Sequence, residues 1–367
     1  MKIINYTENI NTQDRELPSY FSHYYADENP LFFDIETTGF AALNTTLYLI
    51  GVLWYEDGQI KIRQWFNDDG KSEEELITAF ETFCSHFTML IHFNGAGFDL
   101  PYLKQKAQHL HIDFTVDSRL HQLDIFKEIR NFKTIFALDN MKQVTIEQYL
   151  GIIRTDTYSG GDLINIYQRF VARPDTEKEQ LLLLHNHDDL LGMPQISGIL
   201  NYTAFFNRLA AEDLEILSIK PDESNDKLII IFQYPDYAFL PNRILCSKDS
   251  LFLNASECKA TLQIPVIHDT LKHYFSDYKN YFYLPAEDMA IHKSVASFVE
   301  NSNKEKAKKS TCYTKKTDAF IPCHNTDNIS AFQYDIVDKK IYQSLDTLTN
   351  DNEYVLTYIL QCLKTFN

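Results

Sequence analysis

The residues best suited to chemistry are two acids inside an apolar segment, LFFDIETTGF (residues 31–40). On a β-strand, side chains at positions i and i+2 share a face, so Asp34 and Glu36 point the same way. Two close carboxylates repel each other and raise each other's pKa unless a cation lies nearby. A strand with one solvated face would also accommodate them, but the flanking residues are apolar and a Thr-Thr-Gly turn ends the segment. The pair is therefore a candidate cation site.

A third acid follows a glycine-rich turn. In HFNGAGFDLPYL (residues 92–103), an apolar strand runs into the turn and Asp99 begins the next predicted helix. Aspartate is also a favoured helix N-cap and glycine favours turns, so this placement by itself has a purely structural explanation.

A helix predicted at residues 175–193 carries the last candidates. Within its motif HNHDDLLGM, His185 and Asp189 are four residues apart and share a helix face, whereas His187 points elsewhere. Asp188 also lies within reach of His185, so spacing alone leaves the choice between the two aspartates open. A solvated polar patch is the alternative, although the surrounding leucines indicate a largely buried helix.

These three segments can bring their acids together at one end of a sheet. Three strands and a helix, followed by alternating strands and helices, predict an α/β layer with a mixed sheet. The expected elements include a strand at residues 31–37, a hairpin around Asp57-Gly58 and a strand near 112–117. Four carboxylates at one sheet end suit hard divalent cations. Two such ions about 3.5–4 Å apart can hold an attacking water and a leaving oxygen around a phosphate.

The length and the change in composition along the chain predict more than one domain. The 367 residues leave room for two ordinary domains, and the composition changes between residues 205 and 218. We expect an N-terminal arm over residues 1–30, an α/β domain over 31–210 and a C-terminal α+β accessory domain over 215–367. Within the last, residues 287–309 are expected to be helical.

The charge and the cysteines restrict the class of protein. The net charge is −17, and residues 201–367 hold 18 basic against 22 acidic residues, so −13 falls on residues 1–200. The net negative charge argues against loose binding to a polyanion. Most of the excess carboxylates lie in residues 1–200, where a cation would be needed to offset their repulsion. The six cysteines are scattered without paired spacing, which favours a reducing compartment. No apolar run approaches the roughly 20 residues of a membrane span, and no secretory signal is evident, so we expect a cytoplasmic protein.

The acidic motifs resemble those of the DEDD 3′–5′ exonucleases, which have a ribonuclease-H-like fold. Asp34 and Glu36 match the first motif, D-x-E-T-T-G, residues 94–99 match the second, N-x(2–3)-[FY]-D, and Asp189 matches the third. Within that group the chain looks most like the YprB-type domain. The segment between the second and third motifs, LDNMKQVTIEQYLGIIRTDTYSGGDLINIYQRF (residues 138–170), resembles the residue pattern of that domain. The resemblance covers roughly residues 30–200.

The resemblance implies roles for these residues. The four carboxylates Asp34, Glu36, Asp99 and Asp189 would bind two Mg²⁺ or Mn²⁺ ions. The third motif departs from the family pattern, because His185 stands at the spacing that the family gives to tyrosine. By analogy, this histidine would orient or activate the nucleophilic water.

Other positions would have supporting roles by the same resemblance. Phe40 would stack on the terminal base, with a core position as the alternative, and Asn94 would fix the turn that presents Asp99. Thr37 joins Phe40 and Asn94 as a substrate-binding candidate. Asp124 and Arg154 stand at positions typical of the family and would act as structural supports.

A lysine-rich segment in the second half offers phosphate contacts. NKEKAKKSTCYTKK (residues 303–316) contains six lysines, including Lys308 and Lys309, against one glutamate. It fits a basic surface for single strands, and a solvated lysine-rich helix end is the alternative. The predicted function is a metal-dependent 3′–5′ exonuclease acting on RNA or single-stranded DNA. A catalytically silent nucleic-acid-binding module and a hydrolase of short oligonucleotides are the rival hypotheses.

Overall fold

The computed structural model describes residues 1–8, 19–154, 158, 160–325, 330–349 and 351–366. The chain divides into two compact units. The first consists of Met1–Ala204 with Asp236–Asn242, and the second consists of Phe205–Pro235 with Arg243–Asn367.

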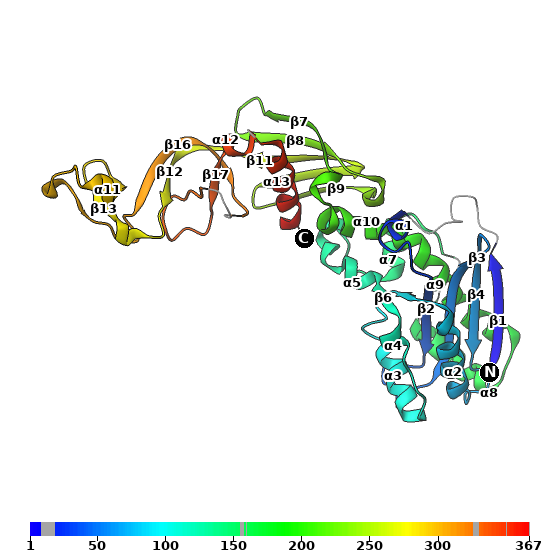
Figure 1. The fold of residues 1–367 in the computed structure, drawn as a ribbon. Helices are drawn as coiled ribbons and strands as arrows, with labels where there is room; N and C mark the ends of the chain where they lie inside the picture. Colours follow the sequence, from blue (N-terminus) through cyan, green and yellow to red (C-terminus); the bar gives the residue numbers. More distant parts are fainter. Residues whose placement is uncertain (9–18, 155–157, 159, 326–329, 350, 367) are drawn as a thin grey trace. The chain divides into compact units, whose positions relative to one another are not determined.

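The first unit is built on a six-stranded mixed sheet with the strand order β1-β4-β3-β2-β5-β6 (Figure 1). Neighbouring strands from β1 to β2 pair antiparallel, whereas β2, β5 and β6 run parallel. Because parallel strands end at the same edge of a sheet, the end of β2 lies near the turn that follows β5. The strands are β1 (Lys2–Glu8), β2 (Pro30–Thr37), β3 (Leu47–Glu56), β4 (Gln59–Phe66), β5 (Met89–His92) and β6 (His121–Asp124).

Helices cover both faces of this sheet. Phe33 and Ile35 of β2 belong to a buried cluster with residues of α2 and α3, and Tyr48 of β3 belongs to a second cluster with α8 and α9. The alternation of β2 therefore sends its apolar side chains toward α2 and α3 and its two acids toward α9. The helices are α1 (Ser19–Tyr24), α2 (Glu73–Phe83), α3 (Asp99–Leu110), α4 (Val116–Arg119), α5 (Ile125–Ile129), α6 (Lys133–Phe136), α7 (Gln143–Tyr149), α8 (Gly160–Ala172), α9 (Thr176–Ile196) and α10 (Leu200–Thr203).

The expected mixed sheet flanked by helices is confirmed, and two local expectations change. The hairpin around Asp57-Gly58 forms β3 and β4. The segment expected to be an N-terminal arm contains β1, which pairs with β4 along its whole length and so becomes an edge strand of the sheet. The strand expected near residues 112–117 is wrong, because α4 begins at Val116 and the parallel strand β6 comes later.

The described residues of the second unit contain three small sheets, two short helices and a longer C-terminal helix. Its five-stranded sheet has the order β7-β8-β11-β10-β9, and two three-stranded sheets have the orders β12-β16-β17 and β14-β13-β15. The strands are β7 (Glu215–Pro221), β8 (Lys227–Gln233), β9 (Leu240–Lys248), β10 (Leu251–Glu257), β11 (Lys259–Pro265), β12 (Ile267–Tyr274), β13 (Tyr281–Leu284), β14 (Met289–His292), β15 (Glu305–Lys306), β16 (Tyr313–Pro322) and β17 (Tyr342–Ser344). The helices are α11 (Lys293–Ala296), α12 (Leu345–Thr349) and α13 (Asn352–Thr365). An α+β C-terminal region is therefore confirmed.

The helix expected at residues 287–309 is wrong. Residues 289–292 form β14, which pairs antiparallel with β13, and the turn between them contains Asp288 with a positive φ of 50°. Only α11 and a single 3-10 turn at Asn301–Asn303 are helical in this stretch, and residues 305–306 pair with β13 as β15. Pairing with the tyrosine-rich β13 thus overrides the local helical preference.

Gly51 on β3 allows α9 to approach the sheet closely. This glycine pairs with Asp34 on β2. A Cβ atom at Gly51 would lie 1.9 Å from Oδ1 of Asn186 and 2.7 Å from Cδ1 of Leu190, both on α9. Any larger residue must therefore displace the helix that carries the third acidic motif.

We expect Gly51→Ala to lower the free energy of unfolding by about 1–3 kcal/mol, because the added methyl overpacks the interface between α9 and β3. Urea denaturation of the full chain measures this. Gly160→Ala is the matched control, since a Cβ atom there meets nothing within 4 Å. Equal stability of the two variants would contradict the prediction.

Candidate active site

The two acids of β2 are held by side chains from neighbouring elements. Asn186 Nδ2 on α9 donates a hydrogen bond of 2.8 Å to Asp34 Oδ2, and Gln64 Nε2 donates one of 2.9 Å to Asn186 Oδ1. The hydroxyl of Tyr48 donates a hydrogen bond of 3.2 Å to Glu36 Oε2. Both carboxylates are thereby fixed on the face of β2 that looks toward α9.

Asp99 is presented by a turn that Asp124 organises. Asp124 Oδ1 accepts a hydrogen bond of 2.9 Å from the amide of Asn94, and its Oδ2 accepts one of 3.2 Å from the amide of Ala96. Asn94 has a positive φ of 64°, a conformation that asparagine tolerates better than most residues. The chain then enters α3, whose first residue is Asp99.

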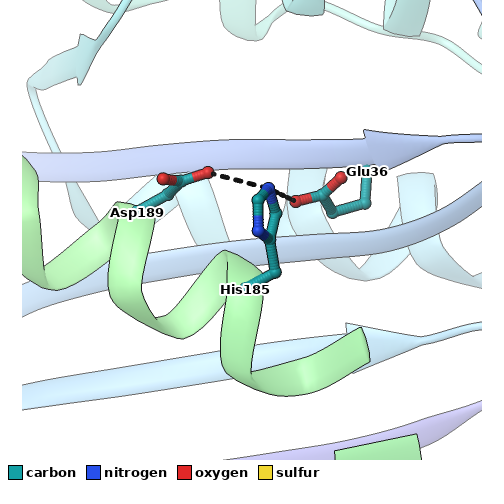
Figure 2. Close-up of side chains that lie close together, drawn as sticks. All are labelled: Glu36, His185 and Asp189. Atoms are coloured by element: carbon teal, nitrogen blue, oxygen red, sulfur yellow. Dashed lines mark ion pairs between the residues drawn. The ribbon is translucent and has the colours of Figure 1, made fainter. Parts of the chain in front are cut away.

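Helix α9 brings His185 and Asp189 to the same place. His185 Nε2 lies 3.7 Å from Glu36 Oε1 and 3.6 Å from Asp189 Oδ2, so the imidazole stands between the two carboxylates (Figure 2). Asp188 faces elsewhere, with its Oδ1 3.8 Å from His187 Nδ1. The helix thus selects Asp189 where spacing alone left two aspartates.

All four acids line one cavity of about 440 Å³. Its other polar residues include His185 and Asn94, and three phenylalanines complete the wall. The full lining is Asp34, Ile35, Glu36, Phe40, Phe93, Asn94, Gly97, Phe98, Asp99, His185 and Asp189. Segments separated by up to about 150 positions in the chain therefore converge on one concave site.

The electrostatics of this cavity favour a cation. Burial, followed by the charges of Asp189, Glu36 and Asp99, raises the pKa of Asp34 well above its usual range. Burial also raises the pKa of Glu36 to about 7, although the nearby imidazole opposes the shift. Burial raises the pKa of Asp99 to about 7 as well. Divalent cations would relieve this repulsion, and the hard oxygen donors suit Mg²⁺ or Mn²⁺.

An ion-pair network behind the cavity holds Asp189. Arg154 Nη1 donates to Asp189 Oδ1 at 2.6 Å and to Glu147 Oε2 at 3.2 Å. Gln143 Nε2 donates to the Asp189 carbonyl at 2.8 Å and to Glu147 Oε1 at 2.9 Å. Gly192 leaves room for this network, because a Cβ atom there would lie 2.2 Å from Glu147 Oε1. One oxygen of Asp189 is thus bound to arginine, and the other faces the cavity.

The remaining predicted site residues lie in different surroundings. Phe40 is 90% exposed and contacts Phe98 edge-on at 5.7 Å between ring centroids, so the alternative of a core position is excluded. The Thr37 hydroxyl donates a hydrogen bond of 2.9 Å to the Gly39 carbonyl and shapes the turn after β2. Lys308 and Lys309 are exposed residues of the second unit.

The sequence analysis did not identify five supporting residues. Asn186 lies within the HNHDD motif but has no spacing that marks it, and Gln64 and Tyr48 resemble ordinary strand residues. Gln143 and Glu147, which contact Asp189 and Arg154, resemble ordinary polar helix residues. For Gln64 and Tyr48, the sequence signal was a polar group at a position that strand alternation predicts to be buried.

One comparison with known proteins agrees with the fold. A model of the RNase_H superfamily matches residues 31–201. The first unit therefore contains an RNase H-like domain. No curated protein sequence matches the chain.

Solved structures with partial similarity include nucleic-acid enzymes. A family B DNA polymerase from the hyperthermophilic archaeon Pyrobaculum calidifontis is 15% identical over 69% of this chain and 35% of that chain, with a TM-score of 0.41. A structure of exonuclease I is 11% identical over 56% of this chain and 55% of that chain, with a TM-score of 0.30. E. coli exonuclease I in complex with a dA16 oligonucleotide is 12% identical over 56% of this chain and 54% of that chain, with a TM-score of 0.27. The chain thus spans about a third of the polymerase and just over half of exonuclease I.

Among the described residues, no helix combines the length and the apolar character needed to cross a membrane.

We expect Arg154→Met to lower the free energy of unfolding by about 3 kcal/mol, because it leaves the fully buried Glu147 and the partly buried Asp189 without their cation. Urea denaturation measures the change. In the control Lys104→Met, an exposed pair with Asp117 is lost, and the expected change is below about 1 kcal/mol. If both variants lost the same small amount, the network would not stabilise the site.

The raised pKa values predict that the metal-free protein loses stability as the pH rises. Glu36 and Asp99 have pKa values of about 7 in the folded chain, against about 4 when unfolded. Between these values the folded state binds more protons than the unfolded state, so the free energy of unfolding falls with rising pH. In EDTA we expect a loss on the order of 4 kcal/mol between about pH 5.5 and pH 8, roughly 2 kcal/mol from each group. Asp99→Asn should reduce that loss. Urea denaturation at both pH values measures it, and a free energy of unfolding that is the same at the two pH values would contradict the prediction.

Proposed function

We propose that the chain is a metal-dependent 3′–5′ exonuclease that hydrolyses phosphodiester bonds of RNA or single-stranded DNA. One observation carries this proposal: four carboxylates from three distant segments line a single cavity of an RNase H-like domain. A structural role explains this poorly, because buried carboxylates without a cation destabilise a fold.

The acids provide the ligands that a two-metal mechanism requires. Asp34, Glu36, Asp99 and Asp189 would hold two Mg²⁺ or Mn²⁺ ions. When bound, such ions supply an activated water and neutralise the charge that develops on the phosphate. The chain's own contribution is to fix the carboxylates, through Asn186, Tyr48, Arg154 and the Asp124-supported turn.

The aromatic residues of the cavity suit a terminal nucleotide. Phe40 is exposed and stands next to Phe98, so its ring can stack on a base while the phosphate enters among the acids. Asn94 and Thr37 support this role by holding the two turns at the cavity. We infer that the 3′-terminal nucleotide binds here.

We infer a nucleic-acid-binding role for the second unit. Lys308 and Lys309 are exposed, whereas Lys304 donates to two backbone carbonyls and Lys315 pairs with Asp288. Only some lysines of the segment therefore remain candidates for phosphate contacts. The cysteines are free thiols, and we infer that the protein works in a reducing compartment, the cytoplasm.

The test is a time course on 5′-labelled single-stranded RNA and DNA with Mg²⁺, Mn²⁺ or EDTA. We expect a ladder that shortens from the 3′ end with metal and intact substrate in EDTA. Asp189→Asn should reduce the rate at least about 100-fold, because a few kcal/mol of charge stabilisation is lost. Asp188→Asn is the matched control on the same helix, outside the cavity lining, and should retain the rate.

Two results would overturn the proposal. Equal turnover by the parent and Asp189→Asn would show that hydrolysis comes from elsewhere. Tight binding of the labelled strand without turnover under any metal would instead identify a silent binding module.

A further inference from the structure

His185 lies between two carboxylates of the cavity. Its Nε2 lies 3.7 Å from Glu36 Oε1 and 3.6 Å from Asp189 Oδ2, distances beyond those of ordinary hydrogen bonds. A ligand atom from each of these three residues lies within 4.8 Å of the other two. Atoms bound at about 2.1 Å to one ion are about 3.0 to 4.2 Å apart, depending on their angle. The two distances from His185 Nε2 fall within this range, which is the spacing expected for ligands of one shared cation.

The two carboxylates are oriented in the same sense. Glu36 accepts the Tyr48 hydroxyl at Oε2, and its Oε1 is the oxygen that faces His185. Asp189 accepts Arg154 at Oδ1, and its Oδ2 is the oxygen that faces His185. Each acid thus has one oxygen held from behind and one oxygen directed to the common point, as outer hydrogen bonds orient metal ligands. Figure 2 shows the imidazole between these two oxygens.

We propose that His185 Nε2, Glu36 Oε1 and Asp189 Oδ2 bind one divalent transition-metal ion, and this inference rests on the proposed function. His185 is then a metal ligand, in place of the water-activating role that the family resemblance implies. One nitrogen and two oxygen donors favour a transition metal over Mg²⁺, because imidazole binds Mg²⁺ poorly. Of the two candidate cofactors, the site selects Mn²⁺.

The competing explanation is an imidazolium ion that pairs with both acids and occupies the cation position itself. In that case Mn²⁺ bound in the cavity would have oxygen ligands only. The two explanations therefore differ in whether nitrogen is coupled to the bound metal, which spectroscopy detects independently of turnover.

The test uses the full chain with one equivalent of Mn²⁺ and pulsed electron paramagnetic resonance. We expect ¹⁴N coupling from a directly bound imidazole in the parent and its loss in His185→Gln. His187→Gln is the matched control, because His187 Nε2 lies 3.2 Å from Glu8 Oε1 and is not part of the cavity lining. In titrations, His185→Gln should weaken Mn²⁺ binding about tenfold or more and Mg²⁺ binding less.

The outcomes separate this inference from the proposed function. Bound Mn²⁺ without ¹⁴N coupling in the parent would overturn His185 ligation while leaving a carboxylate-bound nuclease possible. Coupling retained in His185→Gln would also overturn it. Failure of the parent to bind Mn²⁺ would overturn this inference, and the nuclease proposal would then depend on hydrolysis with Mg²⁺. The parent spectrum decides the matter even if His185→Gln folds poorly.

Discussion

Mutual repulsion among four buried or partly buried carboxylates is the constraint around which the first unit is organised. Burial and the neighbouring acids raise the pKa of Asp34, and burial raises those of Glu36 and Asp99. A fold that retains such groups must either neutralise them with protons or offer them to cations. The cavity suits the second, because all four acids line it together with the exposed Phe40.

Each of the four acids is held by different hydrogen-bonding partners, which fix its position despite the repulsion from the other three. Asparagine and glutamine side chains hold Asp34, a buried tyrosine holds Glu36, and a second aspartate organises the turn before Asp99. An arginine holds Asp189 from behind the cavity. Small residues make these contacts possible, since side chains at Gly51 or Gly192 would collide with the supporting groups. Rigid ligands placed in this way bind metals with little reorganisation.

The sequence predicted correctly the elements that depend on local interactions, and it failed for those that depend on pairing with distant strands. The hairpin at Asp57-Gly58 and helix α9 depend on local turn chemistry and on hydrophobic runs, and both form as predicted. Residues 2–8 and 287–309 depend on strands that pair with them from elsewhere in the chain. A short stretch of sequence does not show which distant strand will pair with it. The sequence therefore predicted an arm where β1 forms and a helix where β14 and β15 form.

The sequence by itself determined the chemistry: the identity of the acids, their alternation on β2 and the mixed sheet that brings strand ends to one edge. Only the tertiary structure decided which oxygen of each acid faces the cavity, because that depends on Tyr48, Asn186 and Arg154, which arrive from three separate elements. The choice of Asp189 over Asp188 likewise required the rotation of α9 against the sheet, which helical spacing leaves open.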